Sequence, residues 1–173
     1  DIVIVLHQMG NHGPAYYKRY PPEFERFKPV CRSNELDQCS NESISNAYDN
    51  AILYTDDFLA RIIELLEGYD DRYATAMWYI SDHGESLGEN GIYLHGLPYF
   101  LAPEAQTRVP SILWLGRQMP DRFRLAAEAR RKAPLSHDNL FDSLLGLSGV
   151  ETTAMTPQRN LFEENATASA EKP

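Results

Sequence analysis

The sequence has no long hydrophobic run and too few basic residues to balance its acidic ones. No apolar run reaches the ~18 residues that a membrane-spanning helix needs, so no spanning segment is predicted within this chain. The chain carries 16 Lys and Arg against 25 Asp and Glu, a formal net charge of −9. This balance argues against broad nucleic-acid binding, which usually needs a basic face. An anionic substrate stays compatible, because a bound metal ion reverses the sign of the charge locally.

An initiator methionine is also missing, and the chain opens at Asp1 directly into an apolar run. Its 173 residues are about the length of one domain and are enough to bury a sizeable core. We interpret the chain as a piece of a longer protein that is cut upstream.

Cysteine is scarce, with only Cys31 and Cys39 present, both in a polar segment. Their short spacing suits a disulfide that pins the loop and stabilises the fold by ~2–3 kcal/mol. A zinc pair is less favoured, because no further cysteine is available. A disulfide would indicate an oxidising compartment, either the periplasm or the cell exterior, whereas free cytosolic thiols are the alternative.

Three apolar stretches predict strands of an α/β sheet. Residues 2–6 form a continuous apolar, β-branched run, which is typical of a strand buried on both faces of a parallel sheet. Residues 74–80 form the second strand, and residues 109–115 form the third, with a proline near its start. A helix between the first two strands predicts a parallel pair with a right-handed connection.

The helices follow from apolar spacing and from their end signals. Ser43 is the expected N-cap of a long helix that runs to about Glu67, with Gly68 as its C-cap. Residues 14–42 are expected to be a surface excursion, and residues 117–134 a surface helix and loop. A second clear helix is predicted from about residue 136 to residue 147, and a flexible tail over 163–173.

Histidines follow two of the predicted strands. His7 and His12 lie in the loop after the first strand, while Asp82 and His83 end the second and His95 follows after a glycine-rich turn. In open α/β sheets, ligands bind beyond the carboxyl ends of the strands. Carboxylate oxygen and imidazole nitrogen suit zinc and similar divalent ions. The alternative is that Asp82 caps a turn and His83 is an ordinary buried histidine.

Four segments resemble the lipid A phosphoethanolamine transferases, the family that includes the mobile colistin-resistance enzymes. They are HQMGNHGPAYYKRYP (7–21), YDN (48–50), SDHGESLGENGIYLHG (81–96) and DNLF (138–141). The resemblance implies the alkaline-phosphatase-like α/β fold, with a mostly parallel sheet flanked by helices and present here as a partial domain. Residues 1–162 would be the C-terminal half of the periplasmic catalytic domain. The spacing of the two cysteines also resembles that of a family disulfide.

The same resemblance implies the activity. Such enzymes move phosphoethanolamine from a phosphatidylethanolamine donor to a lipid A phosphate through a threonine-linked intermediate, with Zn²⁺ as cofactor. They are expected at the bacterial inner membrane, anchored by an N-terminal bundle, with the catalytic domain facing the periplasm. The nucleophilic threonine and the bundle would lie upstream of this chain, so the chain alone is expected to be inactive.

The residue roles that the resemblance implies concern the histidine loops. Asp82 and His83 would be zinc ligands. His12 and His95 would be catalytic and substrate-binding, near the phosphoethanolamine group, or would bind a second metal. His7 shapes its loop only. Glu85, two residues after His83, either orients a ligand imidazole or is a surface carboxylate in a turn.

Two other functions fit the same residues. One is a different metal-dependent hydrolase of the alkaline-phosphatase superfamily, either a sulfatase or a phosphodiesterase. The other is a non-enzymatic metal-binding module in which the histidines only organise loops.

Overall fold

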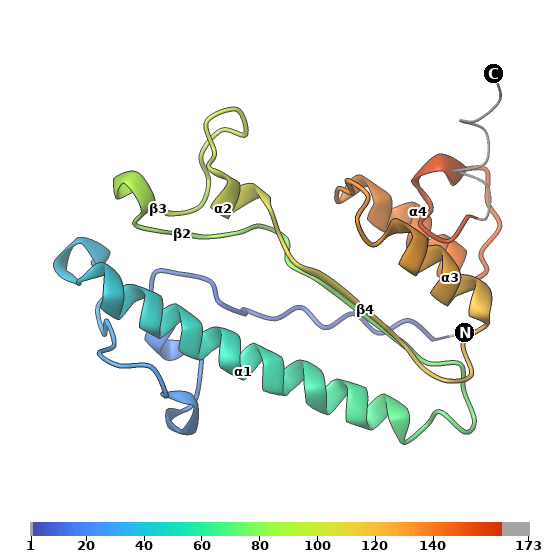
Figure 1. Ribbon diagram of the computed structural model, residues 1–173, viewed down its shortest axis with the longest axis horizontal. Coiled ribbons are helices and arrows are strands. Elements are labelled where there is room, and N and C mark those ends of the chain that lie inside the picture. The colour runs from blue at the N-terminus through green and yellow to red at the C-terminus, as the bar shows by residue number, and fades with distance from the viewer. Residues whose placement is uncertain (1, 164–173) are drawn as a thin grey trace. The chain divides into compact units, whose positions relative to one another are not determined.

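The computed structural model describes residues 2–163, which fall into two compact units (Figure 1). The larger unit comprises residues 4–68 and 77–114, and the smaller unit comprises residues 2–3, 69–76 and 115–163. The elements in chain order are η1 (Tyr16–Lys18), η2 (Pro22–Phe24), η3 (Leu36–Gln38), α1 (Asn41–Glu67), β1 (Ala76–Ile80), β2 (Ser86–Leu87), η4 (Glu89–Gly91), β3 (Tyr93–Leu94), α2 (Glu104–Thr107), β4 (Ser111–Leu115), α3 (Asp121–Arg130), α4 (Asp138–Leu147) and η5 (Pro157–Arg159).

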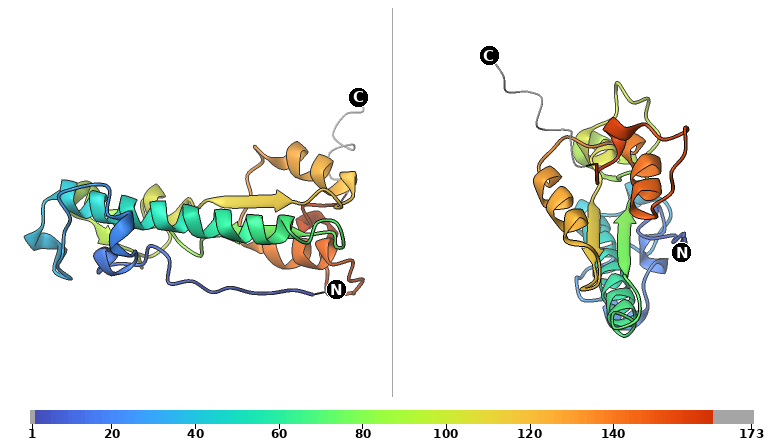
Figure 2. Two further views of the ribbon diagram at one scale, coloured as in Figure 1. Left: turned by 90° about the horizontal axis from the view of Figure 1, so that it is seen from below. Right: turned by 90° about the vertical axis from the view of Figure 1, so that its right-hand side faces the viewer.

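Strands β1 and β4 form a two-stranded sheet and lie side by side in Figure 2. They confirm the strands that we predicted over 74–80 and 109–115, each slightly shorter than expected. The Ser81 N–H donates to the Pro110 carbonyl at 3.3 Å, while the Gly116 N–H donates to the Thr75 carbonyl at 2.9 Å. Because these bonds join opposite ends of the two segments, the pair is antiparallel. Strands β2 and β3 form a second, short antiparallel pair.

The strand predicted over residues 2–6 is wrong. These residues form no strand in the structure, and their apolar side chains are exposed, with Ile2 at 85% and Val5 at 84%. A strand needs a hydrogen-bonded neighbouring strand. An apolar run indicates that its side chains favour burial, but it does not supply that neighbour. Within residues 2–163 no strand pairs with this run, so the parallel pair that we expected it to form with residues 74–80 is absent there.

The N-cap of helix α1 lies three residues earlier than predicted. Ser40 is the N-cap, and its Oγ accepts from the Ser43 N–H at 3.2 Å. Ser43 is instead buried in the first turn and donates from its own Oγ to the Ser40 carbonyl at 2.8 Å. The C-cap at Gly68 is confirmed. No helix of the described residues is long and apolar enough to cross a membrane.

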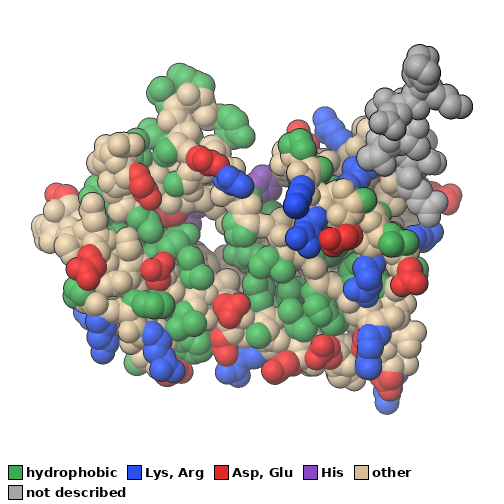
Figure 3. Space-filling view, viewed as in Figure 1, with side chains coloured by type: hydrophobic (Ala, Val, Ile, Leu, Met, Phe, Trp, Pro, Cys, Tyr) green, Lys and Arg blue, Asp and Glu red, His purple; other side chains and the backbone are tan. Residues whose placement is uncertain are grey.

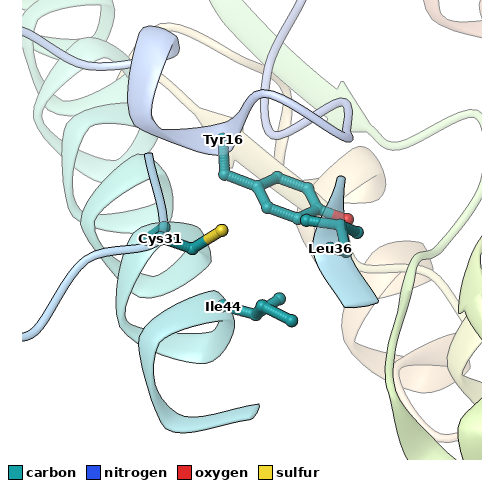
Figure 4. Packing of buried hydrophobic residues seen from close by; sticks show 5 residues of the cluster. Tyr16, Cys31, Leu36 and Ile44 are labelled. Atoms are coloured by element: carbon teal, nitrogen blue, oxygen red, sulfur yellow. The ribbon is translucent and has the colours of Figure 1, made fainter. Parts of the chain in front are cut away.

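The core of the larger unit lies at the start of α1. Tyr16, Cys31, Leu36, Ile44 and Ala47 pack together there, and Figure 4 shows how four of these side chains converge. A disulfide joins Cys31 to Cys39 across eight residues. The surface excursion is thereby fixed to α1 close to the histidine-bearing loop.

Asn50 holds the same excursion in place from the next turns of α1. Its side chain is fully buried, and its Oδ1 accepts from the backbone N–H groups of Arg26 at 2.8 Å and Phe27 at 2.9 Å. Its Nδ2 donates to the Phe27 carbonyl at 3.0 Å. The amide thus satisfies backbone groups that have no secondary-structure partner.

In the smaller unit, Asp70 fastens the start of β1 to the end of β4. Its carboxylate accepts from the Arg117 N–H at 2.7 Å and from the Thr75 hydroxyl at 2.9 Å. The Arg117 N–H is the main reason that the pKa of Asp70 is lowered. Helix α3 confirms the helix expected within 117–134, and α4 confirms the one expected to end at residue 147. Of the expected tail, residues 164–173 lie outside the described residues.

We predict that Asn50→Ala destabilises the natural protein by about 2–4 kcal/mol, because two backbone N–H donors lose the Asn50 acceptor and a cavity forms at a fully buried side chain. Thermal unfolding and limited proteolysis after Arg26 would measure the loss. Asn46→Ala is the matched control, since the half-buried Asn46 side chain donates only to the Pro29 carbonyl, at 3.0 Å, among the described residues. Equal losses for the two variants would contradict the role of Asn50.

Candidate functional site

Three histidines from separate parts of the larger unit meet at one place. His12 comes from the loop before η1, His83 from the loop after β1, and His95 from the end of β3. The His83 and His95 rings stack with centroids 3.8 Å apart, and the His12 ring lies edge-on to both, at 5.7 Å from His83 and 4.8 Å from His95. One ring nitrogen of each lies within 4.8 Å of the others. We call these three side chains the histidine cluster.

The hydrogen bonds of the cluster decide which ring nitrogens remain available. The Nδ1 of His12 lies 2.8 Å from the Gly13 carbonyl, and the Nδ1 of His83 lies 2.9 Å from the Gly84 carbonyl. A carbonyl oxygen only accepts, so in a neutral ring each Nδ1 must carry the proton. The third Nδ1, that of His95, lies 3.0 Å from a carboxylate oxygen of Glu85. All three Nε2 lone pairs are therefore left for a ligand.

Asp82 lies at the edge of the cluster. Its side chain is 79% exposed, and its Oδ1 is 3.9 Å from the His83 Nε2. The same oxygen accepts from the His83 backbone N–H at 3.0 Å, which is the turn-capping role that we considered as the alternative. The structure thus places the predicted ligand pair side by side, but it groups His83 with two imidazoles and leaves the carboxylate facing solvent.

The backbone around the cluster is unusual at two points. Leu94 has a φ of 64°, a left-handed value that is uncommon for a branched side chain. This turn lets Leu94 pack against the core while the next residue, His95, joins the cluster. Gly84 lies so close to α2 that a Cβ there would be 2.0 Å from the Ala105 carbonyl oxygen. Only glycine fits this contact, which holds the loop after β1 against α2.

Of the two interpretations of Glu85 from the sequence, the surface position is wrong, whereas a contact with an imidazole of the site is observed. It is buried, so it is not a surface carboxylate, and it contacts His95 rather than the adjacent ligand candidate His83. Its other oxygen accepts from the Tyr16 hydroxyl at 2.8 Å. The sequence analysis included Tyr16 only as part of the segment 7–21 and gave it no role at the site, because no spacing rule connects residues that are 69 positions apart.

Two further histidines lie elsewhere. His7 is exposed and lies outside the cluster. His137 is the N-cap residue of α4, in the smaller unit.

The loop that follows His95 is strongly apolar and projects from the larger unit between β3 and α2 (Figure 1). Tyr99 is 84% exposed, Phe100 86% and Leu101 61%. Residues 96–103 contain no charged side chain. In the space-filling view this loop is capped by hydrophobic atoms (Figure 3).

The donor set fits a zinc-type ion. Three imidazole nitrogens and a neighbouring carboxylate are the kind of ligands that such ions prefer. The hydrogen bonds at Nδ1 support this assignment, because they orient each ring and leave its Nε2 available to a metal ion.

The sequence profile of the sulfatase family matches residues 1–150. The phosphoethanolamine transferase EptA of Salmonella typhimurium is 50% identical over 157 residues, which cover 88% of this chain and 29% of the relative. The phosphatidylethanolamine transferase Mcr-1 of Escherichia coli is 49% identical over 150 residues, covering 87% and 27%. The Kdo(2)-lipid A phosphoethanolamine 7''-transferase of Escherichia coli is 34% identical over 154 residues, covering 85% and 26%. The chain thus spans less than a third of these relatives.

A solved structure shows the same fold. The C-terminal periplasmic domain of phosphoethanolamine transferase EptC from Campylobacter jejuni superposes with a TM-score of 0.83 at 48% identity. The match covers 90% of this chain and 49% of that domain. It confirms the expected fold class and the expectation of a partial domain.

Proposed function

The chain belongs to the sulfatase family, and from this premise we propose that it forms part of a zinc-dependent transferase. The proposed reaction moves phosphoethanolamine from phosphatidylethanolamine to a phosphate of lipid A, a change that confers polymyxin and colistin resistance. The observation that carries the proposal is the convergence of three oriented imidazoles in a chain about half identical to named transferases. Because the chain is a small part of those relatives, the activity belongs to the full-length protein.

Identity favours transfer over simple hydrolysis. A sulfatase or phosphodiesterase would share the family and the metal-ligating residues, but the relatives at 49–50% identity are named as transferases. In the proposed scheme the nucleophile is a threonine outside this chain, so residues 1–173 alone are expected to be inactive. Hydrolysis of an aryl sulfate by the full-length protein, without phosphoethanolamine transfer, would favour the hydrolase instead.

Within this chain, Asp82 and His83 would hold the zinc ion, which when bound would neutralise charge on the phosphoryl oxygens and activate a coordinated hydroxyl. His12 and His95 would lie against the phosphoethanolamine group or bind a second cation. Their fixed orientation favours either role, because Nε2 lone pairs that already point into the cluster would accept from the ammonium group, or bind a cation, without rearrangement. A chain of net charge −9 needs such local cations to accept an anionic lipid.

The apolar loop at residues 96–103 suits a substrate that resides in a membrane. Tyr and Phe side chains favour the interface between lipid and water, where an aromatic body contacts acyl chains or headgroups. An uncharged loop beside His95 would bring the cluster to headgroup depth without burying a charge. We propose the periplasmic face of the bacterial inner membrane as the location, with the anchor in residues outside this chain.

We predict that Asp82→Ala or His83→Ala in the full-length protein lowers phosphoethanolamine transfer at least about 100-fold and reduces the zinc content, because a ligand is lost. Mass spectrometry of lipid A measures transfer, and elemental analysis of purified protein measures zinc. His137→Ala, outside the cluster, is the control. Full activity with either substitution would refute the ligand assignment.

His95→Ala should slow transfer while most of the tightly held zinc remains, since His95 is assigned to the phosphoethanolamine group. The same two measurements apply. Loss of all metal would instead make His95 a ligand of the main ion.

Phe100→Asp should reduce transfer to lipid A in membranes about tenfold or more, while transfer from a short-chain, water-soluble donor changes less than about twofold. The reason is that a charge at an exposed loop tip opposes contact with lipid. Tyr73→Asp, at a tyrosine 59% exposed in the smaller unit, is the control. Equal losses with both donors would exclude a lipid contact.

A further inference from the structure

Glu85 is the one buried carboxylate in contact with the histidine cluster among the residues that the structure describes. Its side chain is 4% exposed, and each of its oxygens has a different partner. Oε1 accepts from the Tyr16 hydroxyl at 2.8 Å, and Oε2 lies 3.0 Å from the His95 Nδ1. A buried carboxylate is stable only when its oxygens are satisfied in this way.

Tyr16 anchors this carboxylate to the core. Its side chain is 1% exposed and packs with Cys31, Leu36 and Ile44 at the start of α1 (Figure 4). Burial first, and then the charge of Glu85, raise the pKa of Tyr16 well above its ordinary value. The hydroxyl therefore stays protonated and donates to Glu85. A rigid core residue thus fixes the position of the carboxylate.

The backbone of Gly13 packs directly against the Tyr16–Glu85 pair. A Cβ at this position would lie 2.6 Å from both the Glu85 Oε1 and the Tyr16 hydroxyl oxygen. Gly13 is also the residue whose carbonyl orients His12. The Tyr16–Glu85 pair is therefore enclosed by the loop that supplies the first histidine.

We propose that Glu85, held by Tyr16, is a positioning residue that fixes the ring of His95 with its Nδ1 protonated and its Nε2 directed to the cluster. The inference deepens the proposed function, on which its activity readout rests. His95 then has a charged side chain as its Nδ1 partner, which the other two rings lack. His12 and His83 are oriented by backbone carbonyls next to them in sequence, whereas His95 depends on a charged side chain ten residues away. A carboxylate partner also makes the opposite ring nitrogen a better electron donor.

The main test removes the carboxylate in the full-length protein. Glu85→Leu should lower the rate of phosphoethanolamine transfer to that of His95→Ala, because nothing then holds the ring. Glu85→Gln should retain about a tenth of the wild-type rate, since its amide oxygen still accepts from Nδ1. In a His95→Ala background, Glu85→Gln should cause no further loss beyond about twofold. A larger loss in that background, or a wild-type rate for Glu85→Gln, would overturn the proposal.

Glu89→Gln is the matched control, because Glu89 is an exposed carboxylate four residues farther along the same loop. It should leave the rate within about twofold of wild type. Tyr16→Phe should lower the rate less than Glu85→Leu does, since it loosens the carboxylate but does not remove it. Thermal unfolding of each variant shows whether it folds. Should Glu85→Leu fail to fold, Glu85→Gln and Tyr16→Phe decide the question.

A second readout does not need activity. In metal-free full-length protein labelled with ¹⁵N-histidine, His95 should carry its proton on Nδ1, with the signal assigned by its loss in His95→Ala. Glu85→Leu should convert that signal to a mixture of tautomers, and Glu89→Gln should not change it. An Nε2-protonated His95 in the wild type would overturn the positioning role. If the wild type shows this tautomer but no phosphoethanolamine transfer, the proposed function fails while the positioning stands.

Discussion

One buried carboxylate determines how three distant loops meet. Glu85 joins η1, through Tyr16, to the end of β3, through His95. Neither segment contains enough regular structure to hold a side chain by itself, because β3 has two residues and η1 three. A charge buried in this place is unstable without both partners, so the carboxylate stabilises only the arrangement in which they are present. The histidine cluster exists in that arrangement.

The cluster also has an electrostatic consequence for the chain around it. Three ring nitrogens converge in a chain of net charge −9, and under the proposed function a cation would bind among them. Because hydrogen bonds at Nδ1 already orient the three rings, the rings need not rotate to bind a cation. Under the proposed function, a metal ion bound there would supply the positive potential that a phosphate group needs.

The sequence predicted those parts of the fold that depend on local signals. Strands β1 and β4, the end of α1 at Gly68 and the helix that ends at Leu147 follow from apolar spacing and end residues within a few positions. The cap at Ser40 rather than Ser43 was missed because both serines are plausible caps and the choice depends on which hydroxyl reaches the free N–H groups.

Local sequence patterns did not predict the contacts between residues that are distant in the sequence. The apolar run at residues 2–6 forms a strand only if a neighbouring strand pairs with it. The side chains of the run itself do not show whether such a strand is present. The same holds for Glu85. Its two interpretations from sequence, support for an imidazole or a surface position, differ only in burial, and burial depends on Tyr16, which is 69 residues away. The sequence located the histidines, and one of its two interpretations made Glu85 a support for an imidazole. It did not indicate that the ring in contact with Glu85 is that of His95.

Three local features meet at the cluster: the left-handed φ of Leu94, the close approach at Gly13 and the buried charge of Glu85. The buried charge is unfavourable by itself, and the backbone strain at Leu94 costs about 1–3 kcal/mol. A loop selected only for stability would avoid the strain and the buried charge. Glycine at position 94 and an apolar side chain at position 85 would lower the free-energy cost of folding. All three features act on the same geometry. Leu94 sets where His95 leaves the chain, Glu85 sets how its ring is turned, and Gly13 lets the His12 loop close over both. Strain and buried charge that serve one geometry are what a preorganised site requires, and a loop-stabilising role for the histidines does not account for them.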